Sequence, residues 1–498
     1  EIVQLLNGPE GFTPDGEFLL GPTGVKGFWV ACAFCAHGLA GAGGIGKAMA
    51  EWIIEGTPEW DCWRLDVRRF GPHYVSQKFI LNRTIESNSR YYDIHLPGEE
   101  RQSERNFRLG PAYQREKELG AFFGEKFGWE RPNWYSLYEK DAKHGYKPRG
   151  WAGIHWSPAI GYEHIGTRER AGLFDESSFS KIELRGPGAL DFLQHMCAND
   201  LDKPVGAVIY TSMLNERGGI ECDFTVTRTA PDRFLIITGT AFGQHDISWL
   251  RLHMPEDGTL VVEDVTSTYA CLGLWGPRAR AILERVTRED VSNSGFPYMT
   301  AKRITVGNVP VLAMRVTYVG ELGWEFYCSM EYGAKLWDTL WEAGKPDGIV
   351  AAGYKAIDTL RLEKGYRYWG ADINPDYTPF ETGMGFAVKL EKGDFIGRKA
   401  LLKQKKEGIK QKLCCMTVAD PTAIALGNEP IFKDGKVVGW VTSGGYGYTV
   451  RKSIAYGYLP FEIAKPGNQF EVELFGERIK ITVERDPLYD PKGERIKA

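Results

Sequence analysis

The sequence predicts an α+β protein that contains a pseudo-duplicated domain and ends in a small C-terminal β-barrel. Two observations lead to this fold class. Residues from about 165 to 390 contain an internal repeat, and the residues after about 410 fall into short runs typical of strands. The length of 498 residues is enough for about three domains of ordinary size.

The repeat begins with a strand that runs into Gly-Pro and then into a helix. Residues 181–193 read KIELRGPGALDFL, and residues 271–283 read CLGLWGPRARAIL. Proline in the first helical turn loses no hydrogen bond, so both copies suit a strand–turn–helix unit. Each copy continues into a hairpin and an amphipathic helix, at 210–229 and 244–254 in the first and at 311–328 and 334–343 in the second. Two such units predict a pocket between pseudo-equivalent halves.

The C-terminal tail reads as strands only. Residues 430–441 contain an Asp434-Gly435 turn between two apolar runs, which is among the strongest local signals for a hairpin. Residues 454–459 and 470–483 add further strands. We therefore expect a small barrel.

The front of the chain predicts a strand, a glycine loop and a helix. Gly27–Phe34 reads as a buried strand, Gly38–Gly46 as the loop, and Lys47–Glu55 as a helix that ends at Gly56. The glycines at 41–46 match the G-x-G-x-x-G pattern of dinucleotide-binding turns. They begin several residues after the strand, and no second βαβ unit follows. A glycine-rich helix start packed against a cofactor is therefore favoured over an independent NAD site, with plain helix–strand packing as the alternative.

The composition argues against nucleic acid and membrane as partners. The formal net charge is −4, with 61 basic and 65 acidic residues, so no positive field is available for a nucleic acid, and we expect none as a partner. Gly27–Gly46 is long enough to span a membrane, but six of its residues are Gly, so we expect no membrane association. The chain begins at Glu1 without a readable leader, and we interpret it as a piece of a longer protein.

Nine scattered cysteines indicate a reducing compartment, which means the cytoplasm or, in a eukaryote, the mitochondrial matrix. Cys32 and Cys35 have ligand-like spacing, but three residues on a strand place them on opposite faces. We interpret both as core cysteines and expect no metal site.

A set of short motifs resembles the glycine-cleavage T-protein (aminomethyltransferase) superfamily. No single motif is specific, but their order and spacing agree from about residue 150 to the end of the chain. The motifs are Gly218–Asp223, Tyr318–Glu325, Arg361–Ile373, Thr378–Gly385, Phe395–Arg398 and Gly439–Gly444.

The front of the chain resembles dimethylglycine and sarcosine dehydrogenases or oxidases. Phe28–Trp52 looks like the end of their flavin domain, and Asp66–Trp134 looks like their connecting domain. The resemblance implies four parts: 1–65, the remnant of an FAD-dependent oxidoreductase domain; 66–145, the connecting domain; 146–400, an aminomethyltransferase-like folate-binding domain; and 401–498, the barrel. It also implies a missing N-terminal flavin domain as a partner.

The resemblance implies an enzyme for FAD- and tetrahydrofolate-dependent oxidative demethylation of a small N-methyl amine like dimethylglycine or sarcosine. The flavin domain would oxidise the amine to an iminium, and this chain would transfer the one-carbon unit to tetrahydrofolate. Two alternatives stay open. One is a non-catalytic regulator like the pyruvate dehydrogenase phosphatase regulatory subunit, and the other is a stand-alone folate-dependent aminomethyl- or methyltransferase.

Asp223 is the candidate catalytic residue. If Phe224 and Val226 face the core, alternation along the strand turns Asp223 to the opposite side, between the repeated units. Position alone predicts a solvated carboxylate, whereas the resemblance places Asp223 beside the folate. A fixed carboxylate there would stabilise a cationic iminium.

The resemblance assigns further site residues. Tyr318, Glu325 and Arg361 match the folate pocket, and Ala36, His37, Gly38 and Leu39 match the loop against the flavin ring. Position alone predicts only a packed or hydrogen-bonded His37. One departure concerns the helix near 358, where the aminomethyltransferases have Arg and this chain has Ile357. Recognition of the folate tail through that Arg is not carried over.

Overall fold

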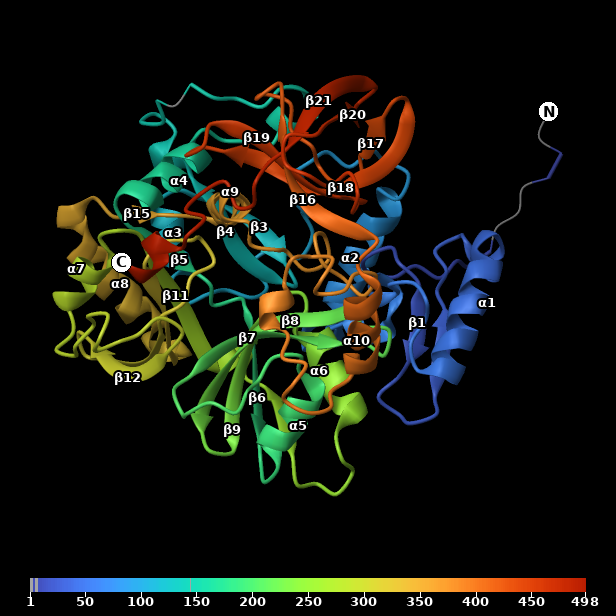
Figure 1. The fold of residues 1–498 in the computed structure, drawn as a ribbon, viewed down its shortest axis with the longest axis horizontal. Helices are drawn as coiled ribbons and strands as arrows, with labels where there is room; N and C mark the ends of the chain where they lie inside the picture. Colours follow the sequence, from blue (N-terminus) through green and yellow to red (C-terminus); the bar gives the residue numbers. More distant parts are fainter. Residues whose placement is uncertain (1–2, 5–7, 144) are drawn as a thin grey trace.

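The computed structural model describes residues 3–4, 8–143 and 145–498. Two β-sheets and a barrel form the body of the molecule, and α1 (Gly38–Glu55) lies at one edge of it (Figure 1). In the described ranges, no helix has both the length and the apolar character needed to cross a bilayer.

The duplicated domain consists of two sheets with equivalent strand orders, antiparallel except for the parallel pair β5–β15. The first sheet has the order β10-β6-β9-β8-β7 and the second the order β12-β13-β14-β11-β5-β15. The first half comprises β6 (Ser180–Arg185), α5 (Ala189–Met196), β7 (Val208–Leu214), β8 (Ile220–Ala230), β9 (Arg233–Thr238), α6 (Gly243–His253) and β10 (Val261–Asp264). The second half comprises β11 (Tyr269–Trp275), α7 (Ala279–Glu284), β12 (Ala301–Val306), β13 (Val309–Met314), β14 (Gly323–Ser329), α8 (Gly333–Gly344) and β15 (Val350–Ala351), with β5 (Gly172–Asp175) inserted beside β11.

The duplication is confirmed, but the predicted pairing of hairpins was wrong by one strand. The prediction matched β7–β8 with β13–β14, whereas the equivalent of β7–β8 is β12–β13. The strand that the prediction missed is β9, which reads RFLIIT and is buried along five of its six residues. A strand buried on both faces shows no apolar–polar alternation, so the hydrophobic pattern does not identify it as a strand.

Gly-Pro recurs in both halves because the backbone requires a glycine there. Gly186 and Gly276 adopt φ values of 131° and 137°, which side chains other than hydrogen rarely allow. A Cβ at Gly186 would collide with the carbonyl oxygen of Thr259, and one at Gly276 with that of Arg170. The repeated sequence therefore marks a repeated backbone constraint.

The C-terminal barrel is closed in the order β16-β19-β18-β17-β20-β21. Its strands are β16 (Gln411–Val418), β17 (Pro430–Lys433), β18 (Lys436–Gly447), β19 (Lys452–Pro460), β20 (Gln469–Leu474) and β21 (Glu477–Val483). Asp434 and Gly435 both have positive φ, as the predicted two-residue hairpin turn requires. The predicted barrel is confirmed.

The front of the chain differs from its prediction. The strand is only β2 (Trp29–Cys32), paired with β1 (Leu19–Pro22), and its residues are half-buried or exposed. The glycines at 41–46 lie inside α1 and form no loop, so they provide no phosphate-binding turn. Cys35 is buried as predicted, but Cys32 is exposed because β2 has only one neighbouring strand in the described ranges.

The remaining elements join the front to the duplicated domain. They are α2 (Gln77–Ser89), α3 (Tyr113–Glu118), β3 (Ala121–Lys126), β4 (Trp129–Tyr135), α4 (Ala159–Glu169), α9 (Tyr354–Lys364), α10 (Arg398–Glu407) and α11 (Glu494–Lys497). Strand β4 packs against α4 and α9, and the backbone N–H of Tyr135 donates to Glu163 at 2.6 Å. This contact fixes the front unit against the second half.

Candidate functional site

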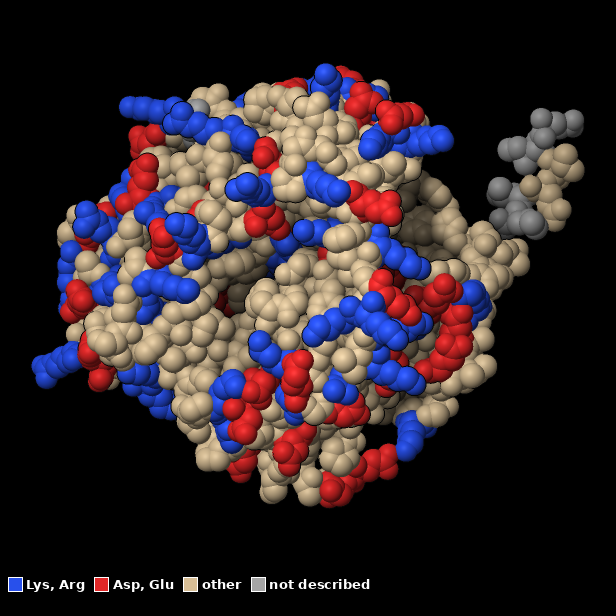
Figure 2. Space-filling model, in the orientation of Figure 1, with Lys and Arg blue, Asp and Glu red and all other residues tan. Residues whose placement is uncertain are grey.

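Asp223 lies on the face of the first sheet that is turned toward the second. Phe224 and Val226 are buried with α5 and α6, whereas Asp223 is half-buried on the other side of β8, as the alternation predicted. Further along this face, the Thr227 hydroxyl lies 3.3 Å from the sulfur of Met314 in the second sheet. Figure 2 shows a hollow at the centre of the molecule, in the region where Figure 1 places β11 on one side and β7 and β8 on the other.

Tyr210 fixes the carboxyl group of Asp223. Its hydroxyl donates to Oδ2 at 2.9 Å and lies 3.7 Å from the sulfur of Met384. The pKa of Asp223 is raised to about 7 as the net result of three causes: burial raises it, the hydrogen bond from Tyr210 lowers it, and the charge of Asp246 raises it. Near neutral pH the group can therefore act as an acid or as a carboxylate.

Tyr318 interacts electrostatically with both Arg361 and Asp223. The Tyr318 hydroxyl donates to the carbonyl of Arg367 at 2.8 Å, and its ring lies nearly parallel to that of Tyr366. Arg361 Nη1 donates to Asp372 at 2.8 Å, whereas its buried Nε has no hydrogen-bond partner in the described part of the chain. The structure therefore brings three of the predicted residues together.

Glu325 lies at a different point of the same space between the sheets. Trp324 and Phe326 point into the helix-covered core, so alternation turns Glu325 and Tyr327 toward the first sheet. Glu325 accepts a hydrogen bond from the Tyr327 hydroxyl, and burial raises the pKa of this carboxyl to about 7. Among the described residues, no hydrogen bond or ion pair joins Glu325 to Asp223.

The predicted flavin residues lie apart from this group, at the start of α1. Ala36 and Leu39 are exposed, with 98% of Leu39 accessible to solvent, and His37 and Gly38 are half-buried. The Ala36 N–H donates to Glu10 at 2.8 Å, and the His37 ring lies 5.5 Å from that of Tyr91. These four residues line an exposed edge and no enclosed site.

Two functional candidates were missed from the sequence. Tyr210 could have been found, because in the β7–β8 register it pairs with Thr225 and so lies diagonally beside Asp223 on the same face. Glu176 follows β5 and is fully buried near Glu325. Nothing in its local sequence indicated this.

Within the described ranges, two sets of three side chains have ligand atoms close enough to hold a metal ion. They are Cys222, His245 and Asp246, and Glu176, Cys271 and Glu325. In the first set, Asp246 and Glu221 raise the pKa of His245 to about 9, although its burial opposes this. An ion-paired imidazolium therefore balances the carboxylates there without a metal.

The structure also shows the position at which the sequence departs from the aminomethyltransferase motif, at Ile357 before Asp358. Ile357 is buried in the core, and Asp358 is exposed on the same helix, α9. The position at which aminomethyltransferases carry Arg is therefore occupied here by a packing residue.

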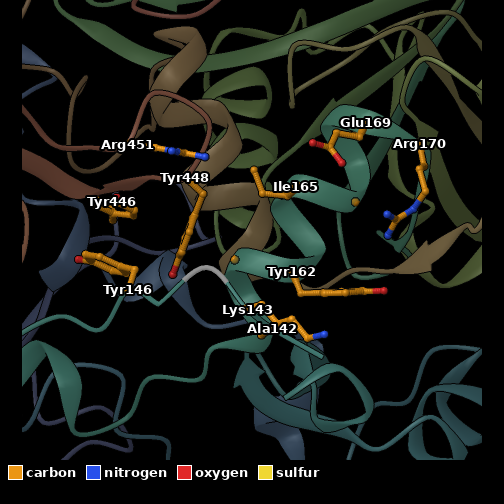
Figure 3. Close-up of a pocket in the computed structure, with 12 residues that line it drawn as sticks. Ala142, Lys143, Tyr146, Tyr162, Ile165, Glu169, Arg170, Tyr446, Tyr448 and Arg451 are labelled. Carbon is orange, nitrogen blue, oxygen red and sulfur yellow. The ribbon is translucent and has the colours of Figure 1, made fainter. Parts of the chain in front are cut away.

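A separate surface pocket of about 440 Å³ lies against α4. Tyr162 and Ile165 of α4 line it together with Tyr446 and Tyr448 from the end of β18, and in Figure 3 the Tyr162 ring points away from the other two tyrosines. The rings of Tyr146 and Tyr446 stack at 3.5 Å there. None of the predicted site residues line this pocket.

The fold and the motifs are those of the glycine cleavage T-protein family. The GCVT N-terminal domain matches residues 112–392, the glycine cleavage T-protein C-terminal barrel domain matches 411–490, and the FAD dependent oxidoreductase central domain matches 55–109. The chain therefore belongs to the glycine cleavage T-protein family. The predicted fold class is confirmed, and the boundaries at 65, 145 and 400 stay predictions.

The relatives confirm the resemblance at the front of the chain as well. The chain is 37% identical to the 4-methylaminobutanoate oxidase (formaldehyde-forming) of Paenarthrobacter nicotinovorans over 99% of this chain and 60% of that protein. It is 36% identical to the mitochondrial dimethylglycine dehydrogenase of Mus musculus over 98% of this chain and 56% of the relative. It is 37% identical to the mitochondrial pyruvate dehydrogenase phosphatase regulatory subunit of the same species over 92% of this chain and 53% of the relative.

A solved structure supports the fold. The aminomethyltransferase T of the glycine cleavage system from Bartonella henselae is 28% identical, with a TM-score of 0.66, over 77% of this chain and 98% of that one. The chain thus spans nearly all of an aminomethyltransferase but only 60% or less of the three curated relatives named above.

Proposed function

We propose that this chain supplies the one-carbon-transfer half of an FAD- and tetrahydrofolate-dependent oxidative demethylation. The substrate would be a small N-methyl amine of the dimethylglycine or sarcosine kind, in keeping with the names of two of the relatives. One observation carries the proposal. The half-buried carboxyl of Asp223, fixed by Tyr210, faces the space between the two sheets and lies near Tyr318.

The residues around Asp223 suit tetrahydrofolate. Its pteridine is flat, and the near-parallel rings of Tyr318 and Tyr366 offer an aromatic surface to it. The pyrimidine edge of the pteridine carries N–H groups, which can donate hydrogen bonds to a carboxylate such as that of Glu325. The unpaired Nε of Arg361 is a donor for an oxygen of the ligand. When bound, tetrahydrofolate supplies the nitrogen that accepts the one-carbon unit.

The chain itself would do two things at Asp223. As a carboxylate in a poorly solvated space, Asp223 stabilises the positive charge of the incoming iminium. With a pKa near neutral, it can also take up the proton that the attacking nitrogen releases. Tyr210 holds the carboxyl in one orientation and so acts as a positioning residue.

The oxidative step belongs to the proposal for the whole protein. Positive φ at Ala33, Cys35 and Ala36 costs about 1–3 kcal/mol at each non-glycine residue, and such strain clusters at ligand-binding segments. Next to this segment of positive φ, Leu39 and Ile54 are exposed on α1. We infer that a flavin domain covers this edge and that Ala36–Leu39 contact its FAD there. The whole protein would work in the cytoplasm or, in a eukaryote, the mitochondrial matrix.

Calorimetric titration with tetrahydrofolate under anaerobic conditions tests the proposal. We expect saturable binding by the unmodified chain and weaker binding by Asp223→Ala. Asp394→Ala serves as the control, because Asp394 is exposed outside the site. If the unmodified chain releases no heat at saturating concentration, the folate assignment is wrong.

A regulatory protein is the second candidate, because one relative is a phosphatase regulatory subunit. The segment Gly218–Asp223, with its carboxyl aimed between the sheets, favours the enzyme. Capture of a phosphatase together with no affinity for folate would favour the regulator. Full turnover after removal of residues 1–145 would instead support a stand-alone transferase.

A further inference from the structure

A second group of buried acids lies in the second half of the duplicated domain. Glu176 directly follows β5, Cys271 lies on β11 and Glu325 on β14, and these three strands are neighbours in one sheet. One polar atom from each of the three side chains lies within 4.8 Å of the others. The group is separate from the Asp223–Tyr210 pair, and two of its members, Glu176 and Cys271, have no role in the function proposed above.

Glu176 is the unusual member of this group. Its side chain is fully buried, and neither of its carboxyl oxygens has a hydrogen-bond partner in the described part of the chain. A buried polar group without a partner costs free energy, so native proteins rarely keep one without a reason. An unpaired acceptor that lies between strands of a well-packed sheet therefore points to a donor that the protein does not itself supply.

The hydrogen bonds that nearby donors make are directed at acceptors other than Glu176. Lys181 Nζ donates to the carbonyl oxygens of Ser177 and Phe179 at 2.8 and 2.9 Å. The Tyr327 hydroxyl donates to Glu325. None of these hydrogen bonds reaches Glu176, so a ligand that pairs with its carboxyl oxygens must bring hydrogen-bond donors.

A divalent cation fits this space less well than an N–H donor. Lys181 is fully buried and interacts electrostatically with both Glu176 and Glu325, so a positive charge is already present. In the part of the chain that the structure describes, no hydrogen bond joins Glu176 to Glu325, so the Glu176 oxygens are not occupied by this neighbour.

We propose that Glu176 is a specificity-determining residue that accepts hydrogen bonds, together with Glu325, from the 2-amino and ring N–H groups of the pteridine. This assignment rests on the proposed function. The two N–H groups of a 2-amino-4-oxopyrimidine are adjacent and point the same way, so a carboxylate can accept both. Phe179 and Tyr354 lie beside Glu176, with their rings 6.1 Å apart, and offer flat surfaces for the ring.

The test compares two ligands and two variants of Glu176. Calorimetry measures the affinity for tetrahydrofolate and for its analogue in which a methyl group replaces the 2-amino group. The unmodified chain should prefer tetrahydrofolate by about 10-fold or more, because a hydrogen bond to a charged group is worth about 1.5–3 kcal/mol. Glu176→Gln should weaken tetrahydrofolate binding about 10-fold and leave binding of the analogue within 2-fold.

Glu176→Leu separates a binding role from a structural one. Removing an unpaired buried carboxyl should leave the melting temperature unchanged or higher while tetrahydrofolate binding is lost. Glu289→Gln is the control, because Glu289 is exposed in the same half. A fall in melting temperature together with an equal loss of both ligands would show that Glu176 is structural and would overturn the assignment.

The remaining outcomes are also decisive. Tetrahydrofolate binding without discrimination against the analogue would overturn the role of Glu176 alone. Absence of any folate binding by the unmodified chain would overturn the proposed function, and this assignment with it. A stoichiometric metal in the purified protein that Glu176→Gln abolishes would show that the space is a metal site instead.

Discussion

The two halves of the duplicated domain share a topology but present different chemistry to the space between them. The first half contributes Asp223, which is half-buried, fixed by a single tyrosine and able to change protonation near neutral pH. The second half contributes Glu325 and Glu176, which are buried more deeply. Duplication thus provides two facing sheets, one suited to act on a charge and the other suited to recognise a ligand.

The largest expected effect comes from the first half. Asp223→Asn should lower the rate of one-carbon transfer to tetrahydrofolate by about 100-fold in the full-length protein, because the neutral amide cannot stabilise a cation. Tetrahydrofolate affinity should fall much less than this rate, because the group acts mainly in the transition state. Single-turnover assays at saturating folate measure the rate, with Asp394→Asn as the control. An unchanged rate would show that the carboxylate is not used.

The next effect comes from the second half and should have the opposite pattern. Glu325→Gln should raise the dissociation constant for tetrahydrofolate by about 10- to 100-fold, because a charged acceptor is lost. The transfer rate at saturating folate should fall far less than in Asp223→Asn. Calorimetry and the same single-turnover assay measure the two quantities. If Glu325→Gln lowered the rate and spared the affinity, the division between the halves would be wrong.

A smaller effect is expected at the glycine of the Gly-Pro turn, which both halves share. Gly186→Ala and Gly276→Ala should each lower the free energy of unfolding by more than about 1 kcal/mol, because both positions combine positive φ with a backbone collision. Gly467→Ala is the matched control, since Gly467 has φ of 91° but open space around its Cβ position. Urea unfolding measures all three. Equal losses at the three positions would show that the collisions are relieved without cost.

The smallest effect is a shift of a pH profile. The transfer rate should rise with pH through about 7 as Asp223 loses its proton. Tyr210→Phe removes a hydrogen bond that lowers this pKa, so the midpoint should move to higher pH. Tyr92→Phe, at an exposed tyrosine, is the control. A midpoint that stays in place or moves to lower pH would mean that Tyr210 does not act through Asp223.

The sequence predicted those features that local patterns encode. The Gly-Pro repeat, the Asp434-Gly435 turn and the outward face of Asp223 each follow from backbone sterics or strand alternation, and the structure confirms them. The glycines at 41–46 misled the prediction, because surrounding Leu, Ala and Ile residues continue α1 through them. Strand β9 shows no alternation, and the position of Glu176 depends on three strands that are far apart in sequence. Such placement is a property of the assembled sheet.

A crystal structure of the chain with bound tetrahydrofolate tests the central claim most directly. The account predicts the pteridine between the two sheets, with a carboxyl oxygen of Asp223 within hydrogen-bond distance of the nitrogen that accepts the one-carbon unit. A folate bound in the pocket beside α4, or anywhere that leaves Asp223 without contact, would contradict it.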